Sequence, residues 1–328
     1  MSETSDGTVL ANTSRQLTSD DKILHACSAE FKSKFNLHPF KFNHVLHESG
    51  LFEIPRLAEV AQLMVEKNGN ARAINFRNSA LDAKFSAMPH SKQLAEAFAR
   101  VHENDSWIKL TQAHLFDADY ARVLDAITSE LEALSGFPLR SDMTLVTMTL
   151  LVSSPNISTP FHIDHETNFL FQLQGSKDVC LFPATDRELV PDQEVERYYA
   201  GNFEAARYRR QLQSRGTIFR LNPGEVVHHP SLAPHWVKND NNISVSISIN
   251  YCMKSLEERA RVYQANYVLR KIGLKPLPPG VSPLRDKLKR KVISTLEHRD
   301  PKTFSEVVHW PVTRLKSPLD AVMRLVKR

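Results

Sequence analysis

The sequence predicts an α+β protein with helices on both sides of a strand-rich central region. Three observations support this prediction. Apolar residues recur at helical spacing before residue 142, and from Met143 onward they fall in short strand-like runs separated by turn signals. The length of 328 residues is enough to bury a sizeable core. We expect an N-terminal extension (1–35), a mixed α/β scaffold (36–142), a strand-rich domain (143–255) and a basic helical region (256–328).

The first half is expected to serve as scaffolding. Residues 1–35 carry little periodicity, which predicts a loose or partly ordered extension. Three helices should follow, one opened by Pro55, one capped by Ser91 and one running from about Ala118 to Leu134 before Gly136. Their apolar stripes are Leu57, Val60, Ala61, Met64 and Val65; Leu94, Phe98 and Val101; and Tyr120, Val123, Leu124, Ile127, Leu131 and Leu134. Two short strands are also expected, at Ala71–Phe76 and Trp107–Leu110.

The clearest strand of the central region runs from Ile243 to Tyr251. Its alternate residues form an apolar face (Ile243, Val245, Ile247, Ile249, Tyr251) and a small polar face (Ser244, Ser246, Ser248, Asn250). A half-buried strand with its serines in water has this pattern. In a small barrel the same pattern places the apolar face under helices and leaves an interior with room for a ligand. The alternation alone does not decide between the two.

Three candidate metal ligands favour the barrel. His162 and Asp164 lie two residues apart in a strand-like segment, so their side chains leave the same face. His235 follows far downstream, after the turn Pro223-Gly224. Two imidazoles and one carboxylate on one side of a metal form the facial triad of non-haem Fe(II) oxygenases, which leaves the opposite positions free for a cosubstrate and O₂. We therefore expect His162, Asp164 and His235 to be the metal ligands and the catalytic residues.

The surroundings of these residues carry a more specific pattern across residues 143–252. Around the three ligands the sequence shows Thr159, Pro160, Asn168, Gly175, Lys177, Leu181-Phe182-Pro183, Pro223-Gly224-Glu225 and Asn250. The Asn falls six residues and the Lys fifteen residues after His162, and Asn250 falls fifteen residues after His235. In these motifs and spacings the chain resembles the JmjC-like, cupin-fold 2-oxoglutarate oxygenases, above all the asparaginyl hydroxylase of hypoxia-inducible factor.

The resemblance implies a fold, a chemistry and further site residues. The fold is a double-stranded β-helix, the jelly-roll or cupin barrel, with flanking N- and C-terminal helices. The chemistry uses Fe(II), 2-oxoglutarate and O₂ to hydroxylate a C–H bond of a protein side chain or a small amino-acid-like molecule, and it releases succinate and CO₂. Lys177, helped by the Thr159 hydroxyl, would hold the distal carboxylate of 2-oxoglutarate, and Asn168 and Asn250 would hold the carboxylate on the metal.

Some histidines and one tyrosine fall outside this pattern. His165 should point to the opposite strand face, and His228 and His229 should flank the barrel mouth or pack there, so none is expected to be a ligand. The family also uses an upstream Tyr to hold the distal carboxylate. The only earlier Tyr here, Tyr120, lies in a helical pattern, so that contact is missing or replaced.

Other functions remain open at this point. The same chemistry on an N-methyl group would make the protein a demethylase, although no chromatin-reader module is visible. A cupin that only binds a metal and a ligand, or that isomerises a sugar, has no need of Lys177 and the two asparagines. A nucleic-acid-binding regulator would use the basic C-terminal region, where residues 284–328 hold 12 Lys/Arg against 5 Asp/Glu in a chain of net charge +5. Without a nucleic-acid-binding motif, this charge more simply marks the solvated face of terminal helices.

The remaining features concern the C-terminal region and the setting. A helix with Leu256, Ala260, Tyr263 and Tyr267 should precede a Pro-rich linker at Lys275–Pro283, and a last helix should carry Ser317, Pro318, Leu319, Asp320, Val322, Met323 and Val326. By resemblance, the C-terminal helices suggest a homodimer.

No signal peptide is expected, and the longest apolar run, Thr144–Val152, is too short to span a bilayer. The three cysteines have no metal-ligand spacing, and their odd number argues against a disulfide framework, which favours a reducing, cytoplasmic setting.

Overall fold

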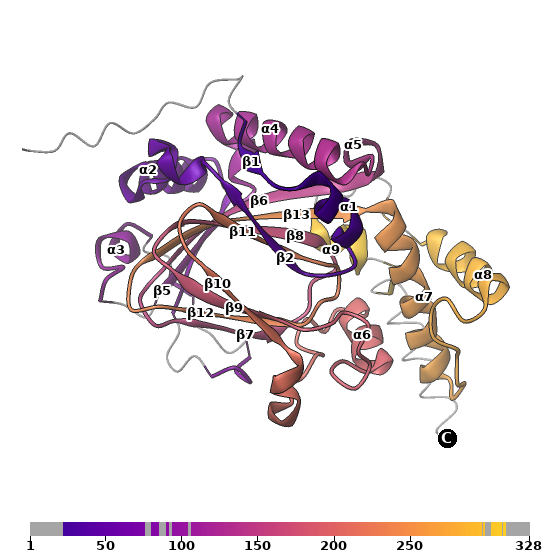
Figure 1. Cartoon of the computed structure of the whole chain (residues 1–328). Coiled ribbons are helices and arrows are strands. Elements are labelled where there is room, and N and C mark those ends of the chain that lie inside the picture. Colours follow the sequence, from indigo (N-terminus) through magenta and orange to yellow (C-terminus); the bar gives the residue numbers. More distant parts are fainter. Residues whose placement is uncertain are drawn as a thin grey trace, which may run out of the picture.

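The computed structural model describes residues 22–75, 80–84, 90–91, 94–103, 106–296, 298, 303–309 and 311–312. Its centre is a barrel of two facing β-sheets, with helices packed around it (Figure 1). Eight strands that follow one another in the chain build the barrel: β6 (Met143–Ser153), β7 (Ser158–His162), β8 (Thr167–Gln174), β9 (Lys177–Leu181), β10 (Thr217–Leu221), β11 (Glu225–His229), β12 (His235–Asn239) and β13 (Ser244–Met253).

The order of the strands is that of a jelly roll. In the larger sheet β6, β13, β8 and β11 are neighbours, and in the smaller sheet the order is β10, β9, β12 and β7. All barrel pairs are antiparallel, and β12 lies between β7 and β9. This arrangement brings the strands that carry His162 and His235 side by side although they are far apart in the sequence. The predicted α+β jelly-roll fold is confirmed.

The N-terminal half extends the larger sheet at both edges and covers its outer face (Figure 1). Its strands are β1 (Leu24–His25), β2 (Phe40–His44), β3 (Asn70–Asn75), β4 (His90–Ser91) and β5 (Ser106–Thr111). Its helices are α1 (Ser28–Lys34), α2 (Ile54–Glu66), α3 (Leu94–Ala99), α4 (Ala118–Ser135) and α5 (Leu139–Asp142), with 3₁₀ turns at Leu46–Glu48, Gly50–Phe52 and Ala113–Leu115.

Three details of this half correct the sequence-based expectation. Part of the extension expected over residues 1–35 is ordered as β1 and α1, because Phe31 is buried in the main core and the Glu130 carboxylate accepts the backbone N–H groups of Ile23 and Leu24 at 2.8 Å. Ser91, expected at the start of a helix, lies in the strand β4, and α3 begins at Leu94. Val65, expected on the buried stripe of α2, is 53% exposed.

The longest predicted helix is confirmed. α4 covers Ala118–Ser135, and all six residues of its predicted apolar stripe are buried. Asp117 caps its first turn by accepting the N–H groups of Asp119 and Tyr120. Gly136 ends it with φ of 66°, a left-handed conformation that glycine adopts without steric cost.

The two faces of β13 have the environments expected for a barrel strand. Its apolar side chains, Val245, Ile247, Ile249 and Tyr251, are buried in the main core between the larger sheet and the N-terminal helices. Its polar face turns into the barrel, and there Ser246 Oγ donates to Gln172 Oε1 of the neighbouring strand β8 at 2.7 Å. A separate apolar cluster fills the middle of the barrel with Leu151, Leu170, Val179, Leu181, Leu221, Val227 and Ala233. The barrel therefore has an interior that is partly aliphatic and partly polar.

The C-terminal region packs beside the barrel. Its helices are α7 (Lys254–Lys271), α8 (Pro283–Ser294) and α9 (Phe304–Val308), and α6 (Asp192–Tyr199) with a 3₁₀ turn at Arg210–Arg215 lies between β9 and β10 in the chain. Leu256, Ala260 and Tyr263 of α7 are buried as expected, whereas Tyr267 is only half-buried. The last predicted helix, with Ser317, Pro318, Leu319, Asp320, Val322, Met323 and Val326, lies outside the described residues. In the described part of the chain, no helix combines the length and the apolar character needed to cross a bilayer.

Candidate metal centre

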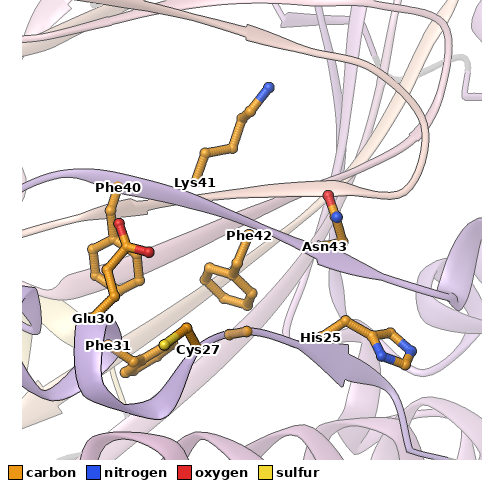
Figure 2. Close-up of a pocket in the computed structure, with 9 residues that line it drawn as sticks. His25, Cys27, Glu30, Phe31, Phe40, Lys41, Phe42 and Asn43 are labelled. Atoms are coloured by element: carbon orange, nitrogen blue, oxygen red, sulfur yellow. The ribbon is translucent and has the colours of Figure 1, made fainter.

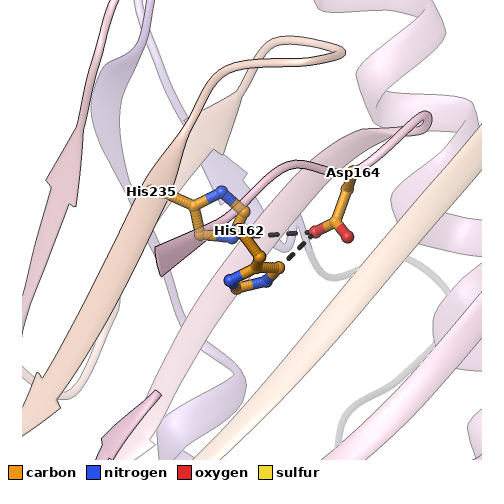
Figure 3. Close-up of side chains that lie close together, drawn as sticks. All are labelled: His162, Asp164 and His235. Carbon is orange, nitrogen blue, oxygen red and sulfur yellow. Dashed lines mark ion pairs between the residues drawn. The ribbon is translucent and has the colours of Figure 1, made fainter. Parts of the chain in front are cut away.

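The structure brings together the ligand atoms of His162, Asp164 and His235. One ligand atom from each residue lies within 4.8 Å of the others (Figure 3). The Nε2 atoms of both histidines are 3.6 Å from Oδ2 of Asp164, and the two rings have centroids 4.1 Å apart. Two imidazole nitrogens and one carboxylate oxygen converging on one point are the donor set of a non-haem Fe(II) site.

Backbone carbonyls hold both imidazoles in the form that binds a metal. His162 Nδ1 lies 2.8 Å from the carbonyl oxygen of Pro160, and His235 Nδ1 lies 3.0 Å from that of Ala233. A carbonyl oxygen only accepts, so each Nδ1 carries the proton and each Nε2 keeps its lone pair for a metal. Burial, together with the neighbouring His162, lowers the pKa of His235 to about 4, which keeps this ring neutral. The residues present therefore fit a divalent iron ion.

Asp164 is positioned by the loop that joins β7 to β8. Its backbone carbonyl accepts the N–H of Leu232 at 2.7 Å, and the next residue, His165, is fixed by two tyrosines of α6. Tyr198 accepts the backbone N–H of His165 at 3.0 Å, and the Tyr199 hydroxyl lies 2.9 Å from His165 Nδ1. His165 therefore faces away from the metal centre, as expected. Asp164 therefore lies just beyond the end of β7, not in the strand that carries His162 as expected, and its backbone is held by the loop before His235.

The metal centre is open on one side. The side chain of His235 is 6% exposed, whereas those of His162 and Asp164 are 19% and 35% exposed. A molecule can therefore reach the site past Asp164 while the barrel wall covers His235.

A β-bulge turns Thr159 into the barrel. The pairing of β12 with β7 joins His235 to His162 but Val237 to Thr159, with a register shift between them. Directly opposed residues share a face, and His235 and Val237 are two residues apart in one strand, so Thr159 and His162 lie on the same face. In a regular strand a spacing of three residues would have separated them.

Lys177 is a buried lysine with no partner among the described residues. It begins β9 after a turn at Gly175, where a φ of 68° and the clash that any Cβ would make with the Ile243 carbonyl oxygen exclude a side chain. Lys177 is 3% exposed and shares its strand face with Val179 and Leu181 of the interior cluster. Burial lowers its pKa to about 7. A cation buried without a counter-charge is costly, which makes this position suitable for an anionic ligand.

Asn168 and Asn250 lie opposite each other on β8 and β13, and they hydrogen-bond to one another. The Asn168 amide also donates to Ser248 Oγ at 2.6 Å, and Ser248 Oγ donates to Asn250 Oδ1 at 2.8 Å. The structure thus places both asparagines on the interior wall across the barrel from β7 and β12. Only the ligand atoms of His162, Asp164 and His235 are shown to converge; Thr159 and Lys177 lie on the smaller sheet and the two asparagines on the larger one, and the roles of all these residues stay predictions.

Two charged residues near the centre were missed from the sequence. Burial and the adjacent Asp164 raise the pKa of Glu166, whose carboxylate is hydrogen-bonded by Asn250. Burial lowers the pKa of Lys109 on β5, against the opposing effect of Asp164 and Glu166. The alternation of Trp107-Ile108-Lys109-Leu110 could have drawn attention to Lys109, because Ile108 and Leu110 are the apolar face of that strand.

The remaining sequence expectations concern residues away from the ligands. Tyr120 belongs to α4 and donates its hydroxyl to the Leu51 carbonyl at 2.6 Å, outside the barrel, so it does not take the place of the family's upstream Tyr. A surface pocket of about 230 Å³ lies between α1 and β2. Figure 2 shows the residues that line it, among them Cys27, Phe31 and Phe42. None of its lining residues belongs to the predicted site.

The model of a family described as the cupin-like domain matches residues 53–257, more than half of the chain. The X-ray structure of E. coli YcfD is similar, with a TM-score of 0.51 and 12% identity over 85% of this chain and 74% of that one. A structure of the Escherichia coli ribosomal oxygenase YcfD with cobalt and 2-oxoglutarate gives a TM-score of 0.46 and 15% identity over 84% and 68% of the two chains. None of the curated proteins matches.

Proposed function

This chain belongs to the cupin-like domain family, and we propose that it is an Fe(II)- and 2-oxoglutarate-dependent dioxygenase. It hydroxylates a C–H bond of a protein side chain or of a small amino-acid-like molecule, and it releases succinate and CO₂. The observation that carries this proposal is the combination of two features in one barrel. Three ligand atoms converge at one end of the smaller sheet, and Lys177, which is buried and has no partner among the residues that the structure describes, begins the strand next to the one that carries His235.

The residues of the site divide into those that hold the metal and those that hold the cosubstrate. His162, Asp164 and His235 bind Fe(II) and leave its opposite positions open. Lys177 binds the distal carboxylate of 2-oxoglutarate, and the Thr159 hydroxyl on the same interior wall assists it. Asn168 and Asn250 hold the carboxylate that binds the metal. Fe(II) with 2-oxoglutarate and O₂ supplies the oxidising power for C–H hydroxylation.

The barrel wall supports this chemistry by excluding water. The aliphatic cluster that includes Leu170, Val179 and Val227 fills part of the barrel interior. An apolar surrounding strengthens the hydrogen bonds to the cosubstrate and limits side reactions of a strong oxidant. The substrate reaches the metal on the more exposed side, past Asp164. This open side leaves room for a side chain presented by a larger molecule.

Two alternatives make different predictions. An N-demethylase uses the same metal and cosubstrate, so it differs only in the product, which loses a methyl group. A cupin that binds a metal without oxygenase chemistry consumes no 2-oxoglutarate, and the buried Lys177 argues against it because such a site has no distal carboxylate to neutralise.

A substrate screen by mass spectrometry tests the proposal. The protein is incubated with iron, 2-oxoglutarate and ascorbate and with peptide and amino-acid libraries, and His38→Ala, a change at an exposed histidine, serves as the matched control for His162→Ala. The gain of one oxygen atom in a library member, present with His38→Ala and absent with His162→Ala, supports the hydroxylase. Loss of a methyl group would identify the demethylase. Succinate formation indistinguishable from that of His162→Ala contradicts both.

A further inference from the structure

A third histidine, His229, lies beside the metal centre. It ends β11, its side chain is buried with 4% exposure, and its ring meets that of His235 edge-on with centroids 4.7 Å apart. Within the described part of the chain, neither nitrogen of His229 has a hydrogen-bond partner. Burying an unpaired donor and acceptor disfavours folding, so an apolar residue would suit this position better if it served only packing.

The preceding residue shows what a histidine with a structural role looks like in the same strand. His228 points to the outer face of the sheet, where its ring packs on Phe169 with centroids 4.7 Å apart. Its Nδ1 donates to the Asn168 carbonyl at 3.1 Å, and its Nε2 accepts the N–H of Asn36 at 3.0 Å. Both nitrogens of His228 are thus satisfied by the protein, whereas both nitrogens of His229 are left for another molecule.

His229 belongs to a row of polar residues on the interior wall of the barrel. His229 is the strand partner of Asn168, and Asn168 is the partner of Asn250, so the three residues form one row across β11, β8 and β13 on the interior wall. The proposed function places the metal-bound carboxylate of the cosubstrate against this row. Both hydrogens of the Asn168 amide are already used, one by Asn250 and one by Ser248. The N–H of His229, in contrast, has no hydrogen bond to a described residue, so it can donate to a ligand without first losing one.

We propose that His229 is a positioning residue that donates a hydrogen bond to the metal-binding carboxylate of the 2-oxo acid cosubstrate. The inference rests on the proposed function. A neutral imidazole carries one N–H and one acceptor nitrogen. That N–H gains its partner only when the cosubstrate is bound, and the bond fixes the acid's orientation on the metal from the β11 side, while Lys177 fixes its far end.

Cosubstrate affinity with a metal that does not turn over tests this role. The wild type and the variants His229→Leu, His229→Gln and His228→Leu are loaded with Mn(II), and 2-oxoglutarate is titrated by calorimetry. His229→Leu removes the donor, so we expect binding weaker by about ten- to a hundredfold with unchanged Mn(II) affinity. His229→Gln keeps an N–H donor and should recover part of this loss. The melting temperature of metal-free His229→Leu should equal or exceed that of the wild type, because an unsatisfied polar group is removed.

The control variant His228→Leu should give the opposite pattern of melting temperature and 2-oxoglutarate affinity. His228→Leu removes two satisfied hydrogen bonds outside the barrel, so its melting temperature should fall while 2-oxoglutarate affinity of the folded protein stays unchanged. Equal 2-oxoglutarate affinity in the wild type and in His229→Leu would overturn the inference, and so would a loss of Mn(II) binding in His229→Leu, which would make the residue a ligand. If the Mn(II)-loaded wild type itself binds no 2-oxoglutarate, the proposed function fails instead.

Discussion

The Nε2 atom of His235 lies 3.6 Å from Oδ2 of Asp164, although the two residues come from distant parts of the sequence. The contact exists because β12 pairs with β7 in the smaller sheet, and because the Asp164 carbonyl accepts the N–H of Leu232 three residues before His235. His162 completes the set from the end of β7. The jelly-roll strand order is thus what brings the three predicted ligands together.

Removal of any ligand should abolish iron binding without unfolding the protein. In His162→Ala, Asp164→Ala and His235→Ala the metal keeps two of its three protein ligands, which is too few to hold Fe(II) against water. We expect iron content below a tenth of the wild-type value and no succinate formation. Iron analysis and circular dichroism check the two parts of this prediction, with His38→Ala as control. Wild-type iron content and turnover in all three variants would contradict the assignment.

Lys177→Ala should weaken cosubstrate binding while leaving iron binding intact. Without the ammonium group, the distal carboxylate is buried with no counter-charge, which costs about 2–4 kcal/mol or roughly thirty- to a thousandfold in affinity. Lys177→Arg should recover only part of the affinity, because the guanidinium is larger and planar. The 2-oxoglutarate concentration for half-maximal succinate formation measures both effects. An unchanged value in Lys177→Ala would remove Lys177 from the site.

Cosubstrate binding should take up a proton above neutral pH. Burial lowers the pKa of Lys177 from its usual 10.5 to about 7, so at pH 8 the free protein holds this amine mostly neutral. A bound carboxylate favours the ammonium form, so binding at pH 8 should take up close to one proton, and binding at pH 6 none. Calorimetry in two buffers with different ionisation enthalpies measures this number. Binding enthalpies at pH 8 that do not depend on the buffer would contradict it.

The same pKa predicts how the stability of the metal-free protein varies with pH. Between about pH 7 and pH 10.5 the unfolded state binds more protons at Lys177 than the folded state, so this residue makes stability rise with pH across that window. Below pH 7 the amine is protonated in both states and the contribution is constant. Lys177→Met should therefore raise the melting temperature most at pH 7 or below, and it should flatten the rise above pH 7. If the melting temperature changed with pH equally in the wild type and in Lys177→Met, the pKa of Lys177 would not be lowered by burial.

The jelly-roll core of this protein was predictable because its signals are local. The alternation of β13 and the stripe of α4 follow from the periods of a strand and a helix. The spacing of Lys177 from His162 could also be read directly. What the sequence does not carry is strand pairing: the bulge that turns Thr159 inward and the row that joins His229 to Asn168 depend on register between distant strands. The order of residues 22–35 likewise depends on burial of Phe31 against elements far along the chain.

Self-association through the C-terminal helices is a further prediction. The residues Leu284, Leu288 and Val292 follow one another at helical spacing on α8 and are 83%, 64% and 56% exposed. Such a stripe, on the side of α8 opposite the buried Ile293, suits contact with a second copy. We expect a homodimer that is lost on truncation after Pro283 and in Leu288→Glu, as measured by light scattering. A monomeric full-length protein, or an unchanged mass after truncation, would exclude this interface.

The central claim is that Fe(II) and 2-oxoglutarate bind together in this barrel, and anaerobic absorption spectroscopy tests it most directly. Iron-loaded wild-type protein titrated with 2-oxoglutarate should develop a visible charge-transfer band, which arises only when the 2-oxo acid binds Fe(II). The band should be weakened in Lys177→Ala at the same cosubstrate concentration and absent in Asp164→Ala. After air is admitted, succinate should form even without substrate. Iron-loaded wild-type protein that shows neither the band nor succinate would contradict the account and favour a cupin that only binds a metal.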